Sequence, residues 1–68
     1  MDKFIEITTI EGVVCSINVS HVFAVSCERS NGDTCTVIKV AARGYNNYPY
    51  QRFVTSMPYC EVMRLIRG

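Results

Sequence analysis

The sequence contains no tryptophan, one histidine and two prolines among its 68 residues. It has no apolar run close to the roughly 20 residues that a membrane-spanning helix needs, so we expect no contact with a membrane. The first residues, Met1-Asp2-Lys3-Phe4, do not form a basic region followed by an apolar segment. A signal peptide is therefore not expected, and the predicted compartment is the cytoplasm.

Signatures of metal binding and catalysis are also missing. The single histidine is His21, no Cys-x-x-Cys pair is present, and the four cysteines are separated by 11, 7 and 24 residues. These spacings match no common zinc site. No glycine-rich phosphate loop follows a predicted strand. No motif indicates that a cysteine or serine nucleophile lies next to a general base. We therefore expect no metal, no cofactor and no enzymatic activity.

The four cysteines would suggest a disulfide framework in a secreted chain of this size, with three ways to pair them. Here Cys15, Cys27 and Cys35 fall within predicted strands. Cys27 and Cys35 point to opposite faces of the hairpin predicted below, so they cannot form a disulfide without a change of register. We expect reduced thiols, with Cys15 and Cys27 in the core and Cys60 on the polar side of a helix.

The length predicts a single small domain spanning residues 1–68. A chain of this length buries only about 60% of its unfolded surface and is marginally stable by itself. A free sheet edge in such a small domain favours self-association. The sequence therefore predicts a homodimer.

A long β-hairpin is predicted from Val22 to Ala42, because two apolar β-branched runs flank the turn signal Asn31-Gly32. The predicted register pairs Arg29 with Thr34, Cys27 with Thr36, Val25 with Ile38 and Phe23 with Val40. The apolar face then carries Phe23, Val25, Cys27, Thr36, Ile38 and Val40. The opposite face, which is predicted to face water, carries Ala24, Ser26, Glu28, Cys35, Val37 and Lys39.

A shorter hairpin is predicted before it, because residues 4–9 and 13–19 both alternate between apolar and polar positions. A three-residue loop at 10–12 pairs Ile5 with Ile17 and Ile7 with Cys15, and Gly12 supplies the left-handed residue that such a loop needs. Ser20 is predicted to cap a single helical turn that leads into the central hairpin.

A fifth strand is predicted at Tyr50–Thr55, and a C-terminal helix is predicted to begin at Ser56-Met57-Pro58 with Ser56 as its cap. The residues Tyr59, Val62, Met63 and Ile66 form one apolar stripe on that helix. The predicted fold class is α+β, mainly β: a five-stranded bent antiparallel sheet or partly open barrel with one C-terminal helix.

The segment 43–53 between these elements is the candidate binding site, because aromatic residues alternate there with arginines. The residues singled out are Arg43, Tyr45, Tyr48, Tyr50 and Arg52. Tyrosine and arginine are frequent anchors of protein interfaces. The same combination also suits single-stranded nucleic acid, since bases stack on rings while cations hold phosphates. A third interpretation is a connection whose tyrosines cover the small core.

The sequence resembles the small FlbD/SwrD-type proteins associated with bacterial flagellar motility, and similar β-rich small proteins of bacteria and phages. The residues that carry the resemblance are Ile5-x-x-Thr8 before Gly12, Ile17-Asn18, Val22 and Val25, and a Ser56-led final helix with Val62, Leu65 and Ile66. The resemblance implies a non-enzymatic role in regulation or assembly. The function that we expect is therefore that of a cytoplasmic regulator or adaptor, of bacterial, phage or prophage origin, which docks on a protein partner. Nucleic-acid binding through residues 43–53 is the alternative.

Overall fold

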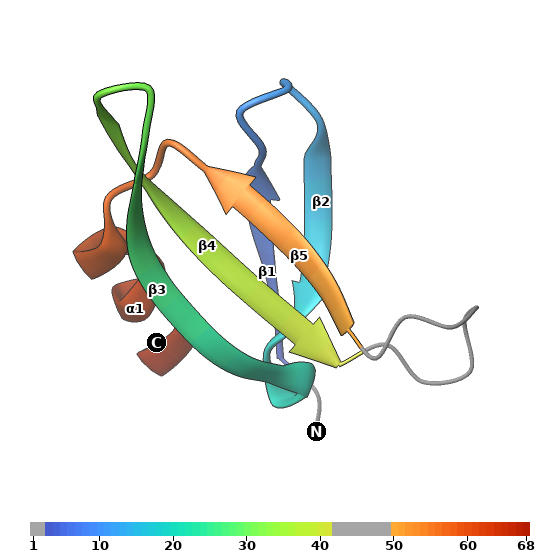
Figure 1. Cartoon of the computed structure of the whole chain (residues 1–68). Helices are drawn as coiled ribbons and strands as arrows, with labels where there is room; N and C mark the ends of the chain where they lie inside the picture. The colour runs from blue at the N-terminus through green and yellow to red at the C-terminus, as the bar shows by residue number, and fades with distance from the viewer. Residues whose placement is uncertain (1–2, 42–49) are drawn as a thin grey trace.

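A computed structural model describes residues 3–41 and 50–68 as a mainly β fold with one C-terminal helix (Figure 1). The elements are β1 (Phe4–Thr8), β2 (Val14–Asn18), η1 (Val19–His21), β3 (Val22–Ser30), β4 (Asp33–Ala41), β5 (Tyr50–Thr55) and α1 (Tyr59–Arg67). The predicted class and the antiparallel pairing are confirmed. The five strands do not form the single bent sheet that we expected, and no closed barrel is seen within the described part. They form a two-stranded sheet, β1-β2, and a three-stranded sheet, β3-β4-β5.

The β1-β2 hairpin follows the register that the three-residue loop predicts. Ile5 lies opposite Ile17, and Ile7 lies opposite Cys15. Gly12 has a φ of +87°, the left-handed conformation for which glycine is preferred. Because side chains alternate along a strand, this register places the isoleucines on one face, and Ile5, Ile7 and Ile17 are buried.

A single 3-10 turn, η1, leads from β2 into β3 where the sequence predicted a capped helical turn. The cap is Asn18, not Ser20 as predicted. The Asn18 side-chain oxygen accepts hydrogen bonds from the backbone N–H of Ser20 at 3.0 Å and from its hydroxyl at 2.7 Å. Asparagine suits this position because its short amide reaches the free N–H groups at the start of a helical turn.

The β3-β4 hairpin confirms the predicted register from the turn as far as Val25 opposite Ile38. Asn31 and Gly32 both have positive φ, at 53° and 82°, as a two-residue hairpin turn requires. Beyond Ala24 the prediction is wrong. Val22, not Phe23, lies opposite Val40, because the register shifts between Val22 and Ala24. This bulge removes Phe23 from the apolar face.

β5 pairs with β4 over the predicted span and connects the two sheets at its end. Thr9 and Thr55 form an isolated antiparallel bridge, and the backbone N–H of Ile10 donates to the carbonyl oxygen of Val54 at 3.0 Å. The Thr55 hydroxyl donates to the carbonyl oxygen of Thr8 at 2.7 Å. β1 therefore meets β5 at one end only, which explains why two sheets form instead of one.

The helix α1 packs against β3 and β4 and contributes Val62 to the core. It begins at Tyr59 with Pro58 at the cap position and no side-chain cap, so the predicted cap at Ser56 is wrong. Val62 is fully buried, whereas Tyr59 is exposed. The core cluster consists of Ile5, Ile7, Ile17, Ile38, Val40 and Val62. Within the described residues, α1 is too short and too polar to cross a membrane.

All four cysteines are free thiols, but two of them are less buried than the sequence predicted. Cys27 is exposed, although we predicted it in the core, and Cys15 is half-buried instead of fully buried. Cys60 is exposed on the helix as predicted, and Cys35 is half-buried. Cys27 does share a face with Val25, but it lies further along the outermost strand, beyond the buried core cluster.

Candidate binding surface

The candidate site lies on the face of the three-stranded sheet that is turned away from the core. On β5, Tyr50 and Arg52 occupy this outer face, because they alternate with Gln51 and Phe53. Tyr50 lies opposite Ala41, and Arg52 lies opposite Lys39. Because of this pairing, Lys39 on β4 joins Tyr50 and Arg52, the two predicted site residues on β5.

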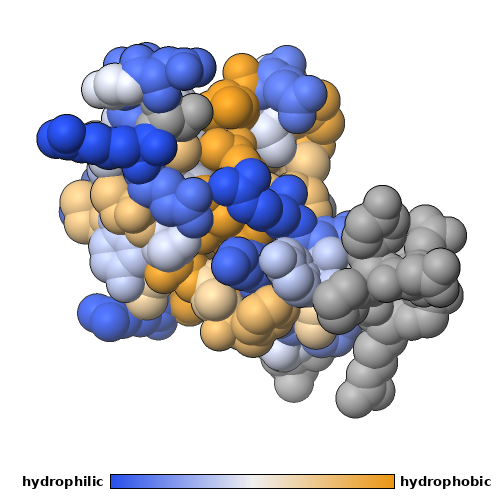
Figure 2. Space-filling view, viewed as in Figure 1, coloured by the Kyte–Doolittle hydropathy of each residue, from blue (hydrophilic) through white to orange (hydrophobic). Residues whose placement is uncertain are grey.

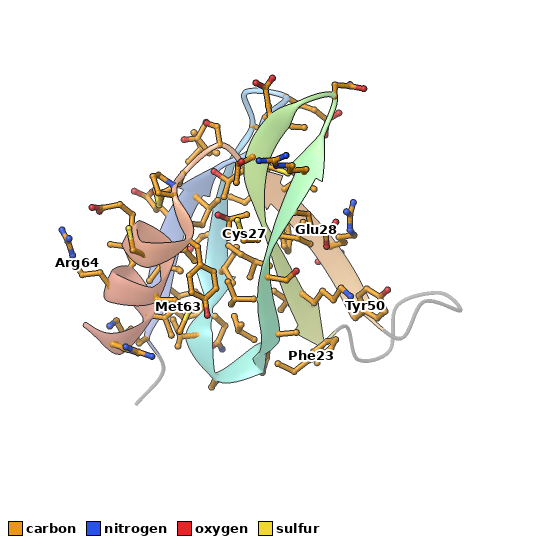
Figure 3. The ribbon with its side chains drawn as sticks, turned by 60° about the vertical axis from the view of Figure 1, so that its left-hand side comes forward. Phe23, Cys27, Glu28, Tyr50, Met63 and Arg64 are labelled. Carbon is orange, nitrogen blue, oxygen red and sulfur yellow. The ribbon has the colours of Figure 1, made fainter. Side chains whose placement is uncertain are left out.

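Phe23 joins the same surface from β3 (Figure 3). The Phe23 and Tyr50 rings are in edge-to-face contact, with centroids 5.6 Å apart and an interplanar angle of 81°. The exposed fractions of the two residues are 57% for Phe23 and 36% for Tyr50. Edge-to-face pairs of this kind add roughly 0.5–1.5 kcal/mol beyond the area that they bury. The bulge thus creates an aromatic pair on the outer face.

Lys39 lies beside the same aromatic pair. Its Nζ is 5.5 Å from the centroid of the Tyr50 ring. An exposed cation–π contact at this distance stabilises the arrangement by about 0.5–1 kcal/mol. We call Phe23, Lys39, Tyr50 and Arg52 the aromatic–basic patch.

Arg52 is held by an acidic side chain two strands away. Its Nη2 donates to Oε1 of Glu28 on β3 at 3.2 Å, and the Ser26 hydroxyl donates to the other oxygen of Glu28, also at 3.2 Å. The ion pair spans the central strand β4 at the level of Val37, whose cross-strand neighbours are Ser26 and Val54. Val37 is fully buried, although the sequence predicted that its face would be open to water. The long side chains above it explain this burial.

Of the five predicted site residues, the structure brings Tyr50 and Arg52 together on one surface. Arg43, Tyr45 and Tyr48 lie outside the described residues. The sequence placed Glu28 and Lys39 on the outer face of the central hairpin, the docking surface expected if segment 43–53 is not one, and it placed Phe23 on the apolar face. The pairing of β4 with β5 would have indicated Lys39, because it directly faces Arg52. No signal indicated Phe23, because its outward position depends on the bulge.

An open groove of about 950 Å³ lies next to the patch, between β2 and the three-stranded sheet. Phe4 and Phe23 contribute aromatic rings to its wall, and Asn18, His21 and Gln51 contribute polar groups. His21 is exposed there. Within the described part of the chain, no three His, Cys, Asp or Glu side chains are grouped so that they could hold a metal ion. The groove presents polar and apolar surface in similar amounts.

A second exposed apolar group lies at the tip of the β1-β2 hairpin (Figure 2). Ile10, Val13 and Val14 are each more than half exposed. Hydrophilic residues lie across the middle of the same view, below this tip. The tip lacks the paired rings and cations of the aromatic–basic patch, which therefore remains the stronger candidate site.

Comparisons with known proteins found no match to this chain. No family model matches the sequence, and no curated protein and no solved structure matches it.

Proposed function

We propose that this protein is a small binding module that docks on a protein partner through the aromatic–basic patch and carries out no catalysis. The observation that supports the proposal is the exposed Phe23–Tyr50 pair. Large rings exposed to water at a fixed geometry are what a partner can bury with little loss of side-chain entropy. Lys39 and Arg52 beside the rings provide the cations that commonly border such anchors.

The charges of the patch favour a protein partner over nucleic acid. Arg52 already pairs with Glu28, and the Glu28 carboxylate lies on the same face. A phosphate approaching Arg52 meets this negative charge, whereas a protein can offer both signs of charge. Single-stranded nucleic acid remains the alternative, because Tyr50 with Lys39 is also a suitable stacking platform.

The biological role that we propose is that of a cytoplasmic regulator or adaptor, in a bacterium or a phage. Small size and an exposed aromatic patch suit a protein that acts by occupying a surface of its target. The resemblance to the flagellar-motility proteins supports the same role. The partner is expected to offer an apolar pocket for Phe23 and Tyr50, bordered by charges that complement Lys39.

The test compares two tyrosine variants in a pull-down from a bacterial lysate. Tyr50→Ala removes a ring of the patch, and Tyr59→Ala removes a similarly exposed ring from α1. We expect Tyr50→Ala to lose the captured partner, because truncating an interface anchor costs about 2 kcal/mol, or roughly thirtyfold in affinity. Tyr59→Ala should retain it. Thermal melts establish that both variants are folded.

A titration with a single-stranded oligonucleotide distinguishes the two partner classes. If the protein binds nucleic acid, affinity will fall steeply with salt, because phosphate contacts release counterions. We expect no such binding at physiological salt. Tight, salt-sensitive binding that Tyr50→Ala abolishes would overturn the protein-docking proposal in favour of the alternative.

A further inference from the structure

The outer edge of β3 is unpaired within the described part of the chain. β3 is an edge strand of the three-stranded sheet, and eight of its nine residues pair with β4 alone. Ser30 and Asp33 form the pair that closes the turn. Hydrogen-bonded and non-hydrogen-bonded pairs alternate from there, so the backbone groups of Val25, Cys27 and Arg29 point toward the free edge.

This edge has little of the protection that natural proteins place on exposed strands. Residues 22–27 contain no proline and no charge, and the devices present are the bulge next to Val22 and the charges of Glu28 and Arg29 near the turn. Proline, lysine and bulges are the usual means of preventing strand addition. From Ala24 to Cys27 the strand is regular and carries no proline, lysine or bulge. It is therefore available to another strand.

We propose that β3 pairs antiparallel with β3 of a second copy of this chain, with the twofold axis at Ser26. In this register, Ser26 faces Ser26 of the second copy and Val25 faces its Cys27. Ala24 faces Glu28 of the second copy. Cys27 is on the side of β3 that faces α1, and Glu28 is on the opposite side (Figure 3). Because side chains alternate along a strand, Val25 shares the side of Cys27, and Ser26 shares that of Glu28. Apolar residues thus meet on one face, and the two Ser26 side chains meet on the other. This proposal does not depend on the proposed function.

Charge complementarity selects this register. Lys39 lies directly opposite Ala24, whose small side chain leaves room above it. Glu28 of the second copy lies on the other side of the same alanine, so Lys39 can reach it across one strand. Arg52 already reaches Glu28 across one strand within the chain. Lys39 has no ion pair among the described residues, and its exposed contact with Tyr50 is weak enough to exchange.

The neighbouring registers fit less well. A shift of two residues toward the turn places Cys27 opposite Cys27 and moves both Glu28 carboxylates closer together, away from Lys39. A shift of two residues the other way brings Glu28 opposite Val22, where the bulge interrupts the strand. The twofold axis at Ser26 is the arrangement that avoids both problems.

The first experiment asks whether the edge of β3 is the interface. Sedimentation velocity of the wild-type chain should show a monomer–dimer equilibrium in the micromolar range. Cys27→Lys places a charge on the edge, and the matched control Cys60→Lys makes the same change at an exposed position of α1. We expect Cys27→Lys to raise the dimer dissociation constant by about tenfold or more, and Cys60→Lys to leave it unchanged.

A second pair of variants tests the charge contact without altering β3. Lys39→Glu should weaken the dimer several-fold, most strongly at low salt, whereas Lys39→Arg should retain it. The register is tested by Ser26→Cys in a background that carries Cys27→Ser and Cys60→Ser. The Cα atoms of the two residues 26 should be about 4.5 Å apart, within the range for a disulfide. Mild oxidation should then give a covalent dimer.

Three results would overturn the proposal. One is a wild-type chain that stays monomeric at the highest concentration reached. Another is a dimer that Cys27→Lys and Cys60→Lys affect equally while both variants remain folded by circular dichroism. The third is a dimer that forms no disulfide between the two introduced cysteines, which would exclude the twofold axis at Ser26.

Discussion

Arg52 on β5 forms an ion pair with Glu28 on β3 across the strand that separates them, with Nη2 and Oε1 3.2 Å apart. β3 and β5 do not pair with each other, so the two side chains connect the outer strands of the sheet. Val37 lies beneath them and is fully buried, on a face that no second layer covers within residues 3–41 and 50–68. The ion pair therefore acts as a cover for an apolar residue as well as an electrostatic contact.

This arrangement predicts that the ion pair and Val37 contribute very differently to stability. Arg52→Ala should lower the free energy of unfolding by about 1 kcal/mol or less, because both side chains are about half exposed and solvent screens the pair. Val37→Ala should cost more, about 1–3 kcal/mol, because it leaves a cavity. Urea unfolding of each variant measures both values.

A double-mutant cycle separates the electrostatic part of this contribution. Arg52→Ala and Glu28→Ala should show a coupling of about 0.2–1 kcal/mol that decreases with added salt. A coupling that does not change with salt would show that packing over Val37, not charge, connects the two residues.

A second relationship, between Thr36 and Thr55, gives a stronger prediction. These residues face each other on β4 and β5, and each is only 1% exposed. The Thr36 hydroxyl donates to the carbonyl oxygen of Met57 at 2.7 Å. The Thr55 hydroxyl donates to the Thr8 carbonyl oxygen at 2.7 Å and accepts from the Met57 N–H at 3.2 Å. The pair thus holds both β1 and the segment before α1.

Thr55→Val should destabilise the fold more than Thr36→Val does. Valine has nearly the same shape, so the main loss is hydrogen bonding, and a buried partner left unpaired costs about 1–3 kcal/mol. Thr55 makes two such bonds and Thr36 makes one. The control is Thr34→Val on the same strand as Thr36, which is exposed and should change stability by about 0.5 kcal/mol or less. Equal effects of Thr55→Val and Thr34→Val in urea unfolding would contradict the role assigned to the buried hydroxyls.

The sequence predicted the strand pairing well where a turn determined it. Asn31-Gly32 set the register of β3 with β4, and Gly12 set that of β1 with β2. The alternation of apolar and polar residues then determined which face is buried. At residues 22–25 every side chain is apolar, so alternation gave no information there. The bulge beside Phe23 was therefore invisible, and so was its contact with Tyr50.

The candidate site was predicted only in part, for a related reason. Tyr50 and Arg52 were found because they belong to a compositionally distinct segment. Glu28 is 24 residues away from Arg52 and on a strand that does not pair with β5. Locating it required the order of three strands and the direction of each side chain. The division into two sheets was missed for the same reason, since it depends on β1 meeting β5 at one end only.

The last prediction concerns the order in which the four thiols react. Cys27 and Cys60 are exposed and Cys15 and Cys35 are half-buried, so alkylation of the dilute, monomeric protein in native buffer should modify the first two before the others. Exposure governs the order here because a reagent must reach the sulfur before it can react. Mass spectrometry of peptides after brief labelling measures each site, and the same labelling in urea is the control, since all four should then react at similar rates. The result would also bear on the proposed pairing of β3, because Cys27 lies at its free edge. Slow labelling of Cys27 that becomes fast on dilution, with Cys60 fast throughout, is the result expected if a second copy covers that edge.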